Sequence, residues 1–265
     1  MVVPRKSLGQ NFLRDENVAR NIVGTVNPGK EDVVLEIGPG TGVLTAHLVP
    51  AAGRYIGVEI DRRSLDLLRM RFPEAEFVEG DILAIRLSDL RIPVGSRLRI
   101  VGNIPYYITS EILFWVLDQR MFIGDATLMM QWEVAKRLTA QPRSKDYGIL
   151  SVVVQMYMIP EVKFRVSANS FYPKPAVDSA VVHLGERPEV PPHPETAFRT
   201  VVRGTFGKRR KTLLNSLRYL GYSEQALRAM RFDLGRRPEE LTGEEFLELT
   251  RELERCSPRM PISRT

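Results

Sequence analysis

Short apolar runs and segments with helical periodicity alternate along the first two thirds of the chain. The runs are rich in Val, Ile and Leu and end near Gly, Asp or Asn, as buried strands do. We expect strands at residues 32–37, 54–61, 77–81, 98–102, 149–157 and 176–184. An N-terminal arm and a helix precede them, over residues 1 to about 29. Strands that alternate with helices predict an α/β fold, in which helices cover both faces of a mainly parallel sheet.

A proline-rich segment, residues 187–194, ends this pattern. Such a segment is stiff, and it marks the best domain boundary. Beyond it the periodicity is helical, and the sequence from Thr242 offers a capping-box start. We expect helices at residues 195–220, 223–230 and 242–255. The predicted parts are an arm plus sheet domain over residues 1–187, a small all-helical C-terminal domain over residues 195–255, and a disordered tail over residues 256–265.

A glycine-rich loop follows the first predicted strand. The sequence Gly-Pro-Gly-Thr-Gly begins at Gly38 and leads into an apolar, helix-like segment, residues 43–48. Glycine is needed where the backbone passes close to a ligand or takes a positive φ. The next strand carries Glu59, which lies about 20 residues after the first glycine, where nucleotide-binding folds place the acid that binds ribose. Close packing of the helix on the sheet is the alternative explanation of this loop.

The glycine spacing separates two kinds of cofactor. A dinucleotide fingerprint has its third glycine at the sixth position, where this chain has Val43, and that glycine helps to seat a pyrophosphate. S-adenosylmethionine has no pyrophosphate, so this spacing favours it over the cofactor of a dehydrogenase. Asp81, at the end of the third strand, can accept from the adenine amine of the cofactor, although alone it is more simply a helix N-cap. With Glu59 and Asn103 at neighbouring strand ends, we prefer the cofactor interpretation.

The fourth strand ends in Asn103-Ile104-Pro105-Tyr106, where open α/β sheets place their ligands. These groups suit the methylation of an exocyclic amine on an aromatic ring, whose nitrogen is a poor nucleophile. The side-chain oxygen of Asn103 and a backbone carbonyl beside Pro105 can accept the two N–H bonds, and Tyr106 can stack on the base. For this tetrapeptide alone, a proline-containing turn with Asn as a local cap is an equal alternative.

Six motifs resemble, in order and spacing, those of the ribosomal RNA adenine N6,N6-dimethyltransferases. They are residues 6–13, 36–42, 59–61, 80–81, 103–106 and 171–179. Segments 206–217 and 236–242 are similar to the C-terminal helical signatures of the small-subunit (KsgA-type) members. The resemblance spans residues 6 to about 255. It implies a Rossmann-like methyltransferase sheet that uses S-adenosylmethionine.

The resemblance also implies the residues of the site. Those implied to contact the cofactor are Asn11, Leu13, Gly38, Glu59, Asp81 and Asn103. Those implied to hold the target adenine are Asn103, Ile104, Pro105 and Tyr106, with Phe171 closing on its other face. The implied reaction is dimethylation of two adjacent adenines in an unpaired loop near the 3′ end of small-subunit (16S) rRNA. One position departs from the family: relatives usually carry Lys or Arg where this chain has Trp132, which leaves its contact with RNA open.

Charge agrees with a polyanionic partner. The 265-residue chain has a net charge of +6 and a pI near 9.5. The stretch from Arg199 to Arg218 contains no Asp or Glu. Its centre is the predicted RNA-binding cluster, Lys208, Arg209, Arg210 and Lys211. A cluster that serves only solubility is the alternative.

Other kinds of site find no support in the sequence. A single cysteine, Cys256, excludes an intramolecular disulfide, and three histidines give no metal-ligand spacing, so we expect no metal. No apolar signal region or long apolar stretch is present, which predicts a cytoplasmic protein without membrane contact. We expect a monomer that acts on rRNA within a pre-ribosomal small subunit. Two rivals stay open: a related enzyme that methylates large-subunit rRNA, and a non-catalytic ribosome-assembly or transcription factor on the same fold.

Overall fold

The computed structural model describes residues 2–93, 95–208 and 211–256. The chain divides into two compact units. The first contains the chain up to residue 135 together with residues 159–186, and the second contains residues 136–158 and the chain from residue 187 onward. The second unit thus resumes at the proline-rich segment. It also takes in residues 136–158, which the sequence assigned to the sheet domain.

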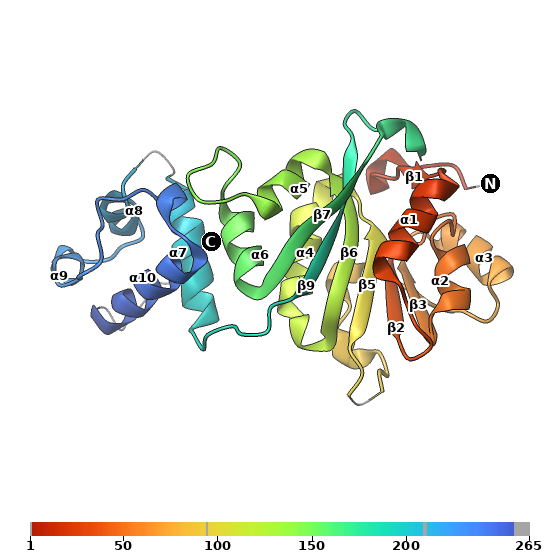
Figure 1. Ribbon diagram of the computed structural model, residues 1–265, viewed down its shortest axis with the longest axis horizontal. Coiled ribbons are helices and arrows are strands. Elements are labelled where there is room, and N and C mark those ends of the chain that lie inside the picture. Colours follow the sequence, from red (N-terminus) through yellow and green to blue (C-terminus); the bar gives the residue numbers. More distant parts are fainter. Residues whose placement is uncertain (1, 94, 209–210, 257–265) are drawn as a thin grey trace. The chain divides into compact units, whose positions relative to one another are not determined.

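The first unit is built on a seven-stranded sheet (Figure 1). In spatial order its strands are β4 (Glu76–Glu79), β3 (Arg54–Glu59), β2 (Val33–Ile37), β5 (Leu98–Asn103), β6 (Ile123–Gln131), β9 (Ser179–Glu186) and β7 (Met158–Val166). The strands from β4 to β6 are parallel, and β9 runs antiparallel to β6. The predicted α/β fold with a mainly parallel, Rossmann-like sheet is therefore confirmed.

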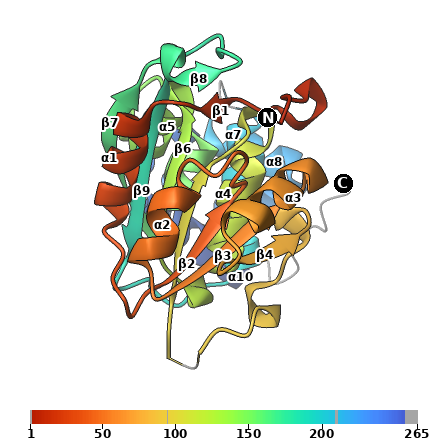
Figure 2. The same cartoon turned by 90° about the vertical axis from the view of Figure 1, so that its right-hand side faces the viewer.

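Helices cover both faces of this sheet (Figure 2). They are α1 (Glu16–Val26), α2 (Thr45–Ala51), α3 (Arg62–Arg71) and α4 (Thr109–Asp118). The chain moves from β2 outward through β3 to β4, and then returns past β2 to β5 and β6. Right-handed crossovers therefore put α2 and α3 on one face and α4 on the other. The strand order reverses between β2 and β5, and a reversal of this kind opens a crevice at the carboxyl ends of the strands.

The apolar pattern of the strands becomes the core. All five residues of β2 are buried, as expected for a central strand covered on both sides. Ile22 of α1 and Leu48 of α2 pack with Val34 of β2 and Met129 of β6 in one apolar cluster. Each of these side chains is at most 2% exposed. Full burial of such a side chain contributes about 1.5 to 3 kcal/mol, so the sheet gives the strand ends a rigid frame.

Shorter elements complete the described chain. β1 (Phe12–Leu13) pairs antiparallel with β8 (Phe171–Tyr172) and fastens the N-terminal arm to the segment before β9. Short 3-10 helices lie at Lys6–Leu8, Ile82–Ala84, Leu87–Asp89, Tyr106–Ile108, Arg120–Phe122, Ala168–Ser170 and Pro238–Glu240. Among the described residues, no helix is both long enough and apolar enough to cross a membrane.

The second unit is helical in its described residues. Its helices are α6 (Ile149–Tyr157), α7 (Glu195–Phe206), α8 (Leu213–Tyr219), α9 (Glu224–Arg228) and α10 (Gly243–Cys256), and α5 (Trp132–Thr139) runs into it from the first unit. Helices α6, α7 and α10 pack on one another. The predicted capping box is confirmed, because the Thr242 hydroxyl accepts from the Glu245 N–H at 3.2 Å and the Glu245 carboxylate accepts from the Thr242 N–H at 2.8 Å.

Two sequence predictions about this region are wrong. Residues 149–157 form helix α6 rather than a strand, and six of these nine residues are buried. A short apolar run fits either element, and here packing against α7 and α10 decides for the helix. The single helix predicted over residues 195–220 is interrupted: α7 ends at Phe206, Gly207 caps it, and α8 begins only at Leu213. Glycine is a poor helix former, which favours a break at this point.

Candidate active site

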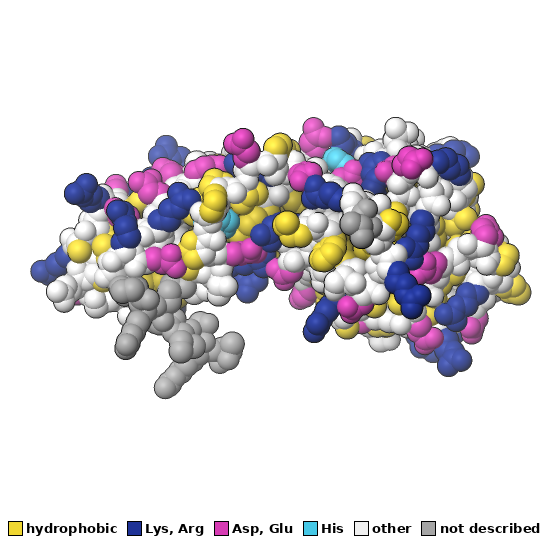
Figure 3. All heavy atoms as spheres, turned by 90° about the horizontal axis from the view of Figure 1, so that it is seen from below, with side chains coloured by type: hydrophobic (Ala, Val, Ile, Leu, Met, Phe, Trp, Pro, Cys, Tyr) yellow, Lys and Arg dark blue, Asp and Glu magenta, His cyan; other side chains and the backbone are white. Residues whose placement is uncertain are grey.

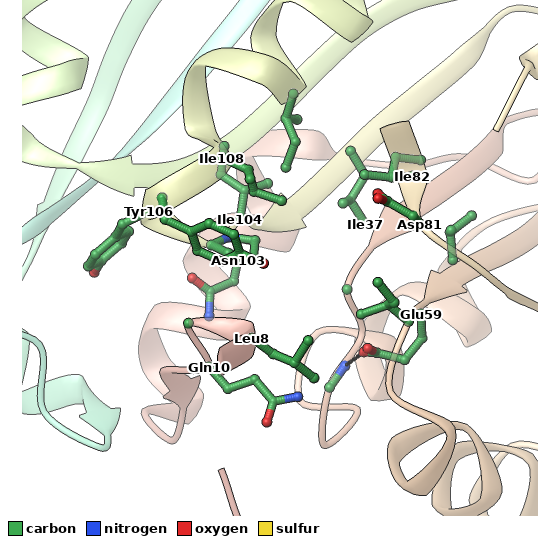
Figure 4. A pocket seen from close by; sticks show the side chains of 18 of the residues that line it. Leu8, Gln10, Ile37, Glu59, Asp81, Ile82, Asn103, Ile104, Tyr106 and Ile108 are labelled. Carbon is green, nitrogen blue, oxygen red and sulfur yellow. Dashed lines mark hydrogen bonds between the residues drawn. The ribbon is translucent and has the colours of Figure 1, made fainter. Parts of the chain in front are cut away.

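A cleft lies at the carboxyl ends of β2 to β5, where the strand order reverses. Its walls come from the N-terminal arm, the loop after β2, the ends of β3 and β4, and the segment after β5. The sequence-predicted residues that line it are Asn11, Gly38, Glu59, Asp81, Asn103, Ile104, Pro105 and Tyr106. Figure 4 shows Asn103 and Tyr106 on one side of the cleft and Glu59 and Asp81 on the other. The topology thus gathers residues that are widely separated in the sequence.

The loop after β2 reaches the cleft as bare backbone. Gly38 and Gly40 have φ angles of +64° and +59°, which residues with a Cβ rarely adopt. A Cβ on Gly40 would lie 3.0 Å from the ring of Phe12 in the arm. At Gly38, by contrast, no atom of the described residues other than Gly38 and its two chain neighbours lies within 4 Å of the Cβ position. Gly40 therefore allows the arm to approach, and Gly38 keeps the cleft open beside β2.

Glu59 is fixed by backbone donors. Glu59 is the last residue of β3 and is only 4% exposed. Its Oε2 accepts from the Gly40 N–H and its Oε1 from the Asp61 N–H, both at 2.9 Å. Burial raises the pKa of this carboxyl, and the two N–H donors oppose the rise. Each oxygen keeps a second lone pair, so a ligand hydroxyl that reaches Glu59 meets an acceptor already held in place.

Asp81 combines the two roles weighed from the sequence. Its Oδ1 accepts from the Leu83 N–H at 3.0 Å and so caps the short helix Ile82–Ala84. The same side chain lines the cleft, and Figure 4 shows its carboxylate directed into it. Capping therefore orients Asp81 without removing it from the cleft. In the described part of the chain, no three His, Cys, Asp or Glu side chains are grouped so as to hold a metal ion.

The N-terminal arm is anchored to Asp61, a residue to which the sequence assigned no role. The Gln10 Nε2 donates to Asp61 Oδ2 at 3.0 Å, and the Gln10 Oε1 accepts from the Arg5 N–H at 2.8 Å. Arg63 pairs with the same carboxylate at 2.6 Å and donates to the Val3 carbonyl at 3.1 Å. The Arg63 guanidinium lowers the pKa of Asp61 to about 2. This network holds the arm over the cleft.

Asn103 is oriented by a hydrogen bond to the arm. Its Nδ2 donates to the Asn11 carbonyl at 2.9 Å. Because a carbonyl can only accept, the amide must present its NH₂ group to Asn11. Its Oδ1 is then left for the cleft, as Figure 4 shows. Asn103 is partly exposed and lines the cleft.

Tyr106 is held at its hydroxyl end. The phenolic oxygen lies 2.6 Å from the Oγ of Ser179 at the start of β9. Burial raises the pKa of Tyr106, so the phenol is neutral at physiological pH. The neighbouring Pro105 carbonyl accepts from the Ile108 N–H and from the Thr109 hydroxyl, both at 3.3 Å. The segment after β5 is therefore fixed at several points before any ligand binds.

Leu13 and Phe171 pair with each other rather than facing the cleft. They are register partners across β1 and β8 and belong to the apolar cluster under α1. Each is only 4% exposed, and neither is among the described residues that line the cleft. In this structure Phe171 does not offer the open stacking face that the resemblance implied. Both residues instead hold the arm against the segment before β9.

Glu36 is a buried acid to which the sequence assigned no role of its own. It lies in β2, is 2% exposed, and accepts from the Thr45 hydroxyl at 2.8 Å and the Tyr55 hydroxyl at 2.6 Å. The pKa of Glu36 is raised to about 7. Burial is the largest cause; the two hydroxyl donors lower the pKa by less, and the nearby Glu59 carboxylate adds a smaller increase. The signal in the sequence was a single acid within an apolar strand, two residues before the glycine loop.

The predicted RNA-binding cluster belongs to the second unit. Lys208 and Lys211 are exposed, and the Lys208 Nζ lies 4.9 Å from the centre of the Tyr219 ring. Arg209 and Arg210 lie outside the described residues. Arg218, in the same basic stretch, pairs with Glu224 at 2.8 Å. On the face seen in Figure 3, Lys and Arg are interspersed with Asp and Glu, so the positive charge on that face does not form one continuous patch.

Comparison with known families gives a match over nearly the whole chain. Residues 2–255 match the family model described as ribosomal RNA adenine dimethylase. Two similar relatives, from Chlorobium phaeobacteroides (strain BS1) and Porphyromonas gingivalis (strain ATCC 33277), are both named ribosomal RNA small subunit methyltransferase A. The first is 44% identical over 252 residues, which cover 95% of this chain and 94% of the relative. The second is 44% identical over 259 residues, which cover 94% and 97%.

Solved structures are similar in fold. A dimethyladenosine transferase from Plasmodium falciparum superposes with a TM-score of 0.79 at 24% identity, over 95% of this chain and 100% of the other. The 23S rRNA methyltransferase ErmE superposes with a TM-score of 0.67 at 30% identity, over 92% of this chain and 100% of the other. The similarity therefore extends through both the sheet and the helical region.

Proposed function

Because this chain belongs to the ribosomal RNA adenine dimethylase family, we propose that it uses S-adenosylmethionine to dimethylate N6 of two adjacent adenines near the 3′ end of small-subunit rRNA. The observation that carries this proposal is the orientation of Asn103. Its NH₂ group is held by the Asn11 carbonyl, and its Oδ1 faces the cleft as an acceptor for an exocyclic amine. The adenine amine is the group that such an acceptor fits.

The opposite side of the cleft fits the cofactor. Glu59 and Asp81 present carboxylate oxygens there, which suit ribose hydroxyls and an adenine amine, and Gly38 leaves room beside the backbone. Apolar side chains such as Ile82 line the same side of the cleft and suit the faces of a purine ring. S-adenosylmethionine supplies an electrophilic methyl group on a positively charged sulfur that is a good leaving group. The residues of the chain therefore need to position the two reactants and to remove water from them. Holding the reactants well can lower the reaction barrier by roughly 7 to 11 kcal/mol.

Asn103 and its neighbours prepare the amine. The Asn103 Oδ1 accepts one N–H bond, and the Ile104 carbonyl is the second acceptor that we propose, since the Pro105 carbonyl already accepts from Ile108 and Thr109. Two acceptors out of the ring plane favour a pyramidal nitrogen, whose lone pair can then attack the methyl group in line. Tyr106 is neutral and serves as a stacking surface rather than a base. The proton leaves to water after the transfer.

The target adenine must reach the cleft unpaired. A base inside a helix has to be flipped out, at a cost of a few kcal/mol. Stacking on Tyr106, worth about 1 to 3 kcal/mol per base, offsets part of this cost. Phe171 could add a second face only if the pairing of β1 with β8 opened, because it is buried beside Leu13. An unpaired rRNA loop is therefore the substrate we expect.

The second unit supplies positive charge for the RNA backbone. The proposed contacts are made by Lys208 and Lys211, which are exposed, and by Arg209 and Arg210, which lie outside the described residues. We further propose that the substrate is rRNA within a pre-ribosomal small subunit and that the protein acts on it as a monomer. Such a substrate would place the reaction in the cytoplasm, where small subunits are assembled.

Mass spectrometry of RNA incubated with the protein and isotopically labelled S-adenosylmethionine tests this function. Small-subunit and large-subunit particles would be assayed separately, because ErmE is named for a reaction on 23S rRNA. The expected product is N6,N6-dimethyladenosine at two adjacent positions in small-subunit rRNA only. Label in large-subunit rRNA alone would favour the ErmE-like reaction. Tight RNA binding without any label would favour a non-catalytic assembly factor.

A further inference from the structure

A cation–aromatic pair lies outside the cleft in the first unit. The guanidinium carbon of Arg165, on β7, is 5.3 Å from the centre of the Trp132 ring at the start of α5. A cation within about 6 Å of a ring centre is attracted to the face of the ring. The Arg165 side chain is nevertheless 58% exposed, and Trp132 is partly exposed. The pair therefore presents both an aromatic surface and a positive charge to solvent.

Asp178 holds this pair in place. Its Oδ2 lies 2.9 Å from the Arg165 Nη2, and its carbonyl accepts from the Trp132 N–H at 3.0 Å. Its Oδ1 accepts from the Ala168 N–H, also at 3.0 Å, which fixes the carboxylate itself. An exposed arginine normally loses side-chain freedom when it binds a ligand. An arginine that is already held loses less, and so binds more readily.

The next residue, Ser179, connects the pair to the cleft. Its Oγ lies 2.6 Å from the Tyr106 hydroxyl, and its register partner in β6 is Gln131, the residue before Trp132. The segment after β5 is also bonded to β6, because the Ile104 N–H donates to the Met129 carbonyl at 3.2 Å. Trp132 and Arg165, both bonded to Asp178, are therefore linked through Ser179 to the segment that carries Asn103 to Tyr106.

We propose that Trp132 and Arg165 form a second nucleotide-binding site, which holds an unpaired RNA nucleotide adjacent in sequence to the methylated adenine. The proposal rests on the proposed function, since it takes an RNA strand as the ligand of the cleft. Unpaired bases stack on aromatic rings and on guanidinium planes, and this pair offers both. The N–H groups of Arg165 that do not face Asp178 can donate to a phosphate. A neighbour held here keeps the strand splayed while the target adenine occupies the cleft.

Arg165→Gln, compared with Lys163→Gln, tests the site directly. Both residues lie on β7 two positions apart, so their side chains share a face, and each change removes one positive charge. Lys163 pairs with Glu161 rather than with an aromatic ring. With a short single-stranded RNA that contains the target adenines, measured by fluorescence anisotropy, Arg165→Gln should weaken binding about five- to tenfold and Lys163→Gln less than twofold. Equal losses would overturn the proposal, because net charge alone would then explain them.

An abasic RNA tests whether a base is stacked. Removing the base on one side of the target adenine should weaken binding to the unaltered protein by about tenfold. In the Trp132→Leu variant the same removal should have little further effect, because the stacking partner is already gone. If the abasic RNA and Trp132→Leu each weaken binding and their free-energy losses simply add, this base does not contact Trp132 and the proposal is contradicted. Circular dichroism of the variant would show that it is folded.

Tryptophan fluorescence of the unaltered protein gives a readout that needs no variant. The chain has two tryptophans. Trp115 is 6% exposed and donates to the Ile85 carbonyl, so acrylamide quenches mainly Trp132. Saturating RNA should protect Trp132, and unchanged quenching would overturn the proposal. If the protein methylates no RNA at all, the proposed function fails. If it methylates RNA while Arg165→Gln behaves like Lys163→Gln, only this site fails.

Discussion

The two sides of the cleft differ in what they leave for a ligand. On the side that we propose for the cofactor (the cofactor side), both oxygens of Glu59 already accept backbone N–H groups. On the side that we propose for the adenine (the base side), Asn103 uses only its NH₂ group, on the Asn11 carbonyl, and its oxygen stays available. Tyr106 is tied at its hydroxyl, and its ring is only partly buried. Backbone N–H groups therefore hold both carboxylate oxygens on the cofactor side, whereas on the base side one bond to the arm orients Asn103 and leaves its oxygen without such a donor among the described residues.

This difference indicates which substitutions should affect cofactor binding and which should affect the rate of methyl transfer. A cofactor has to be held in one position, and fixed backbone donors achieve this without rearrangement. An amine has to be gripped most strongly as it becomes pyramidal, and contacts made only then raise turnover rather than affinity. Substitutions on the base side should therefore lower turnover. Substitutions on the cofactor side should lower cofactor affinity or stability.

The largest expected effect is that of Asn103→Ala. Removing one well-placed polar group from a reaction centre typically costs about 100- to 1000-fold in turnover, and we expect a loss in that range. Cofactor affinity, measured by calorimetry, should fall less than tenfold, because Asn103 is only one of its contacts. The assay is single-turnover methylation of RNA at saturating cofactor. Near-normal turnover would break the comparison, since the base side would then need no acceptor.

Asn103→Asp provides the matched control for that variant. It keeps an acceptor oxygen but removes the NH₂ group that donates to the Asn11 carbonyl. We expect turnover between that of the unaltered protein and that of Asn103→Ala. A turnover as low as that of the alanine variant would mean that orientation by the arm matters more than the acceptor itself.

Glu36 should make stability depend on pH. In the folded protein its pKa is about 7, and in the unfolded chain it is near 4.5. The unfolded state therefore loses its proton first, so this contribution to stability is complete below pH 4.5 and is lost as pH rises through 7. Urea unfolding at pH 5 and pH 8 should show that Glu36→Gln loses roughly 2 to 3 kcal/mol less over this interval than the unaltered protein. Parallel pH dependences would show that Glu36 is ionised throughout.

Glu59→Gln should weaken the cofactor side. A hydrogen bond to a charged acceptor contributes about 1.5 to 3 kcal/mol, so cofactor affinity should fall about 10- to 100-fold. Turnover at saturating cofactor should change little. Glu79→Gln is the matched control, because Glu79 is the register partner of Glu59 on β4 and is exposed. A loss of turnover with unchanged cofactor affinity would contradict this assignment, because Glu59 would then act in methyl transfer rather than in cofactor binding.

The smallest expected effect is that of substitutions in the second unit on the affinity for RNA. Replacing Lys208 and Lys211 together by Gln should reduce the slope of log affinity against log salt by about 1.4 to 1.8, at roughly 0.7 to 0.9 per phosphate contact. The control is the pair Lys30→Gln and Lys163→Gln, which removes the same charge elsewhere. Lys30 precedes β2, at the end of the sheet opposite the cleft. Equal slopes in the two double variants would assign Lys208 and Lys211 to solubility.

The strand ends of the site could be predicted from the sequence. Glu59, Asp81 and Asn103 each follow an apolar run, and parallel strands present their carboxyl ends at one edge of a sheet. The glycine loop could also be predicted from neighbouring residues alone, because its glycine spacing indicates a backbone that has to pass close to other atoms. These features depend on neighbours in the sequence, so a single chain suffices to find them.

The anchors of the site could not be predicted in this way. Asn103 bonds to a residue 92 positions away, Tyr106 to one 73 positions away, and Gln10 to one 51 positions away. No local pattern reports such pairs, because they form only when the arm and β9 reach the sheet. The same limit explains the error at residues 149–157: their apolar character marked a buried segment, but not the helices on which it packs.

The central claim is that the oxygen of Asn103 aims an adenine amine at the methyl group of the cofactor. A crystal structure of the protein with S-adenosylmethionine and adenosine tests it most directly. We predict that the ribose hydroxyls lie on Glu59, the adenosine amine lies within hydrogen-bond distance of the Asn103 Oδ1, and the methyl carbon faces that amine. A methyl carbon that points away from Asn103, or a cleft too narrow there for a purine, would contradict the account.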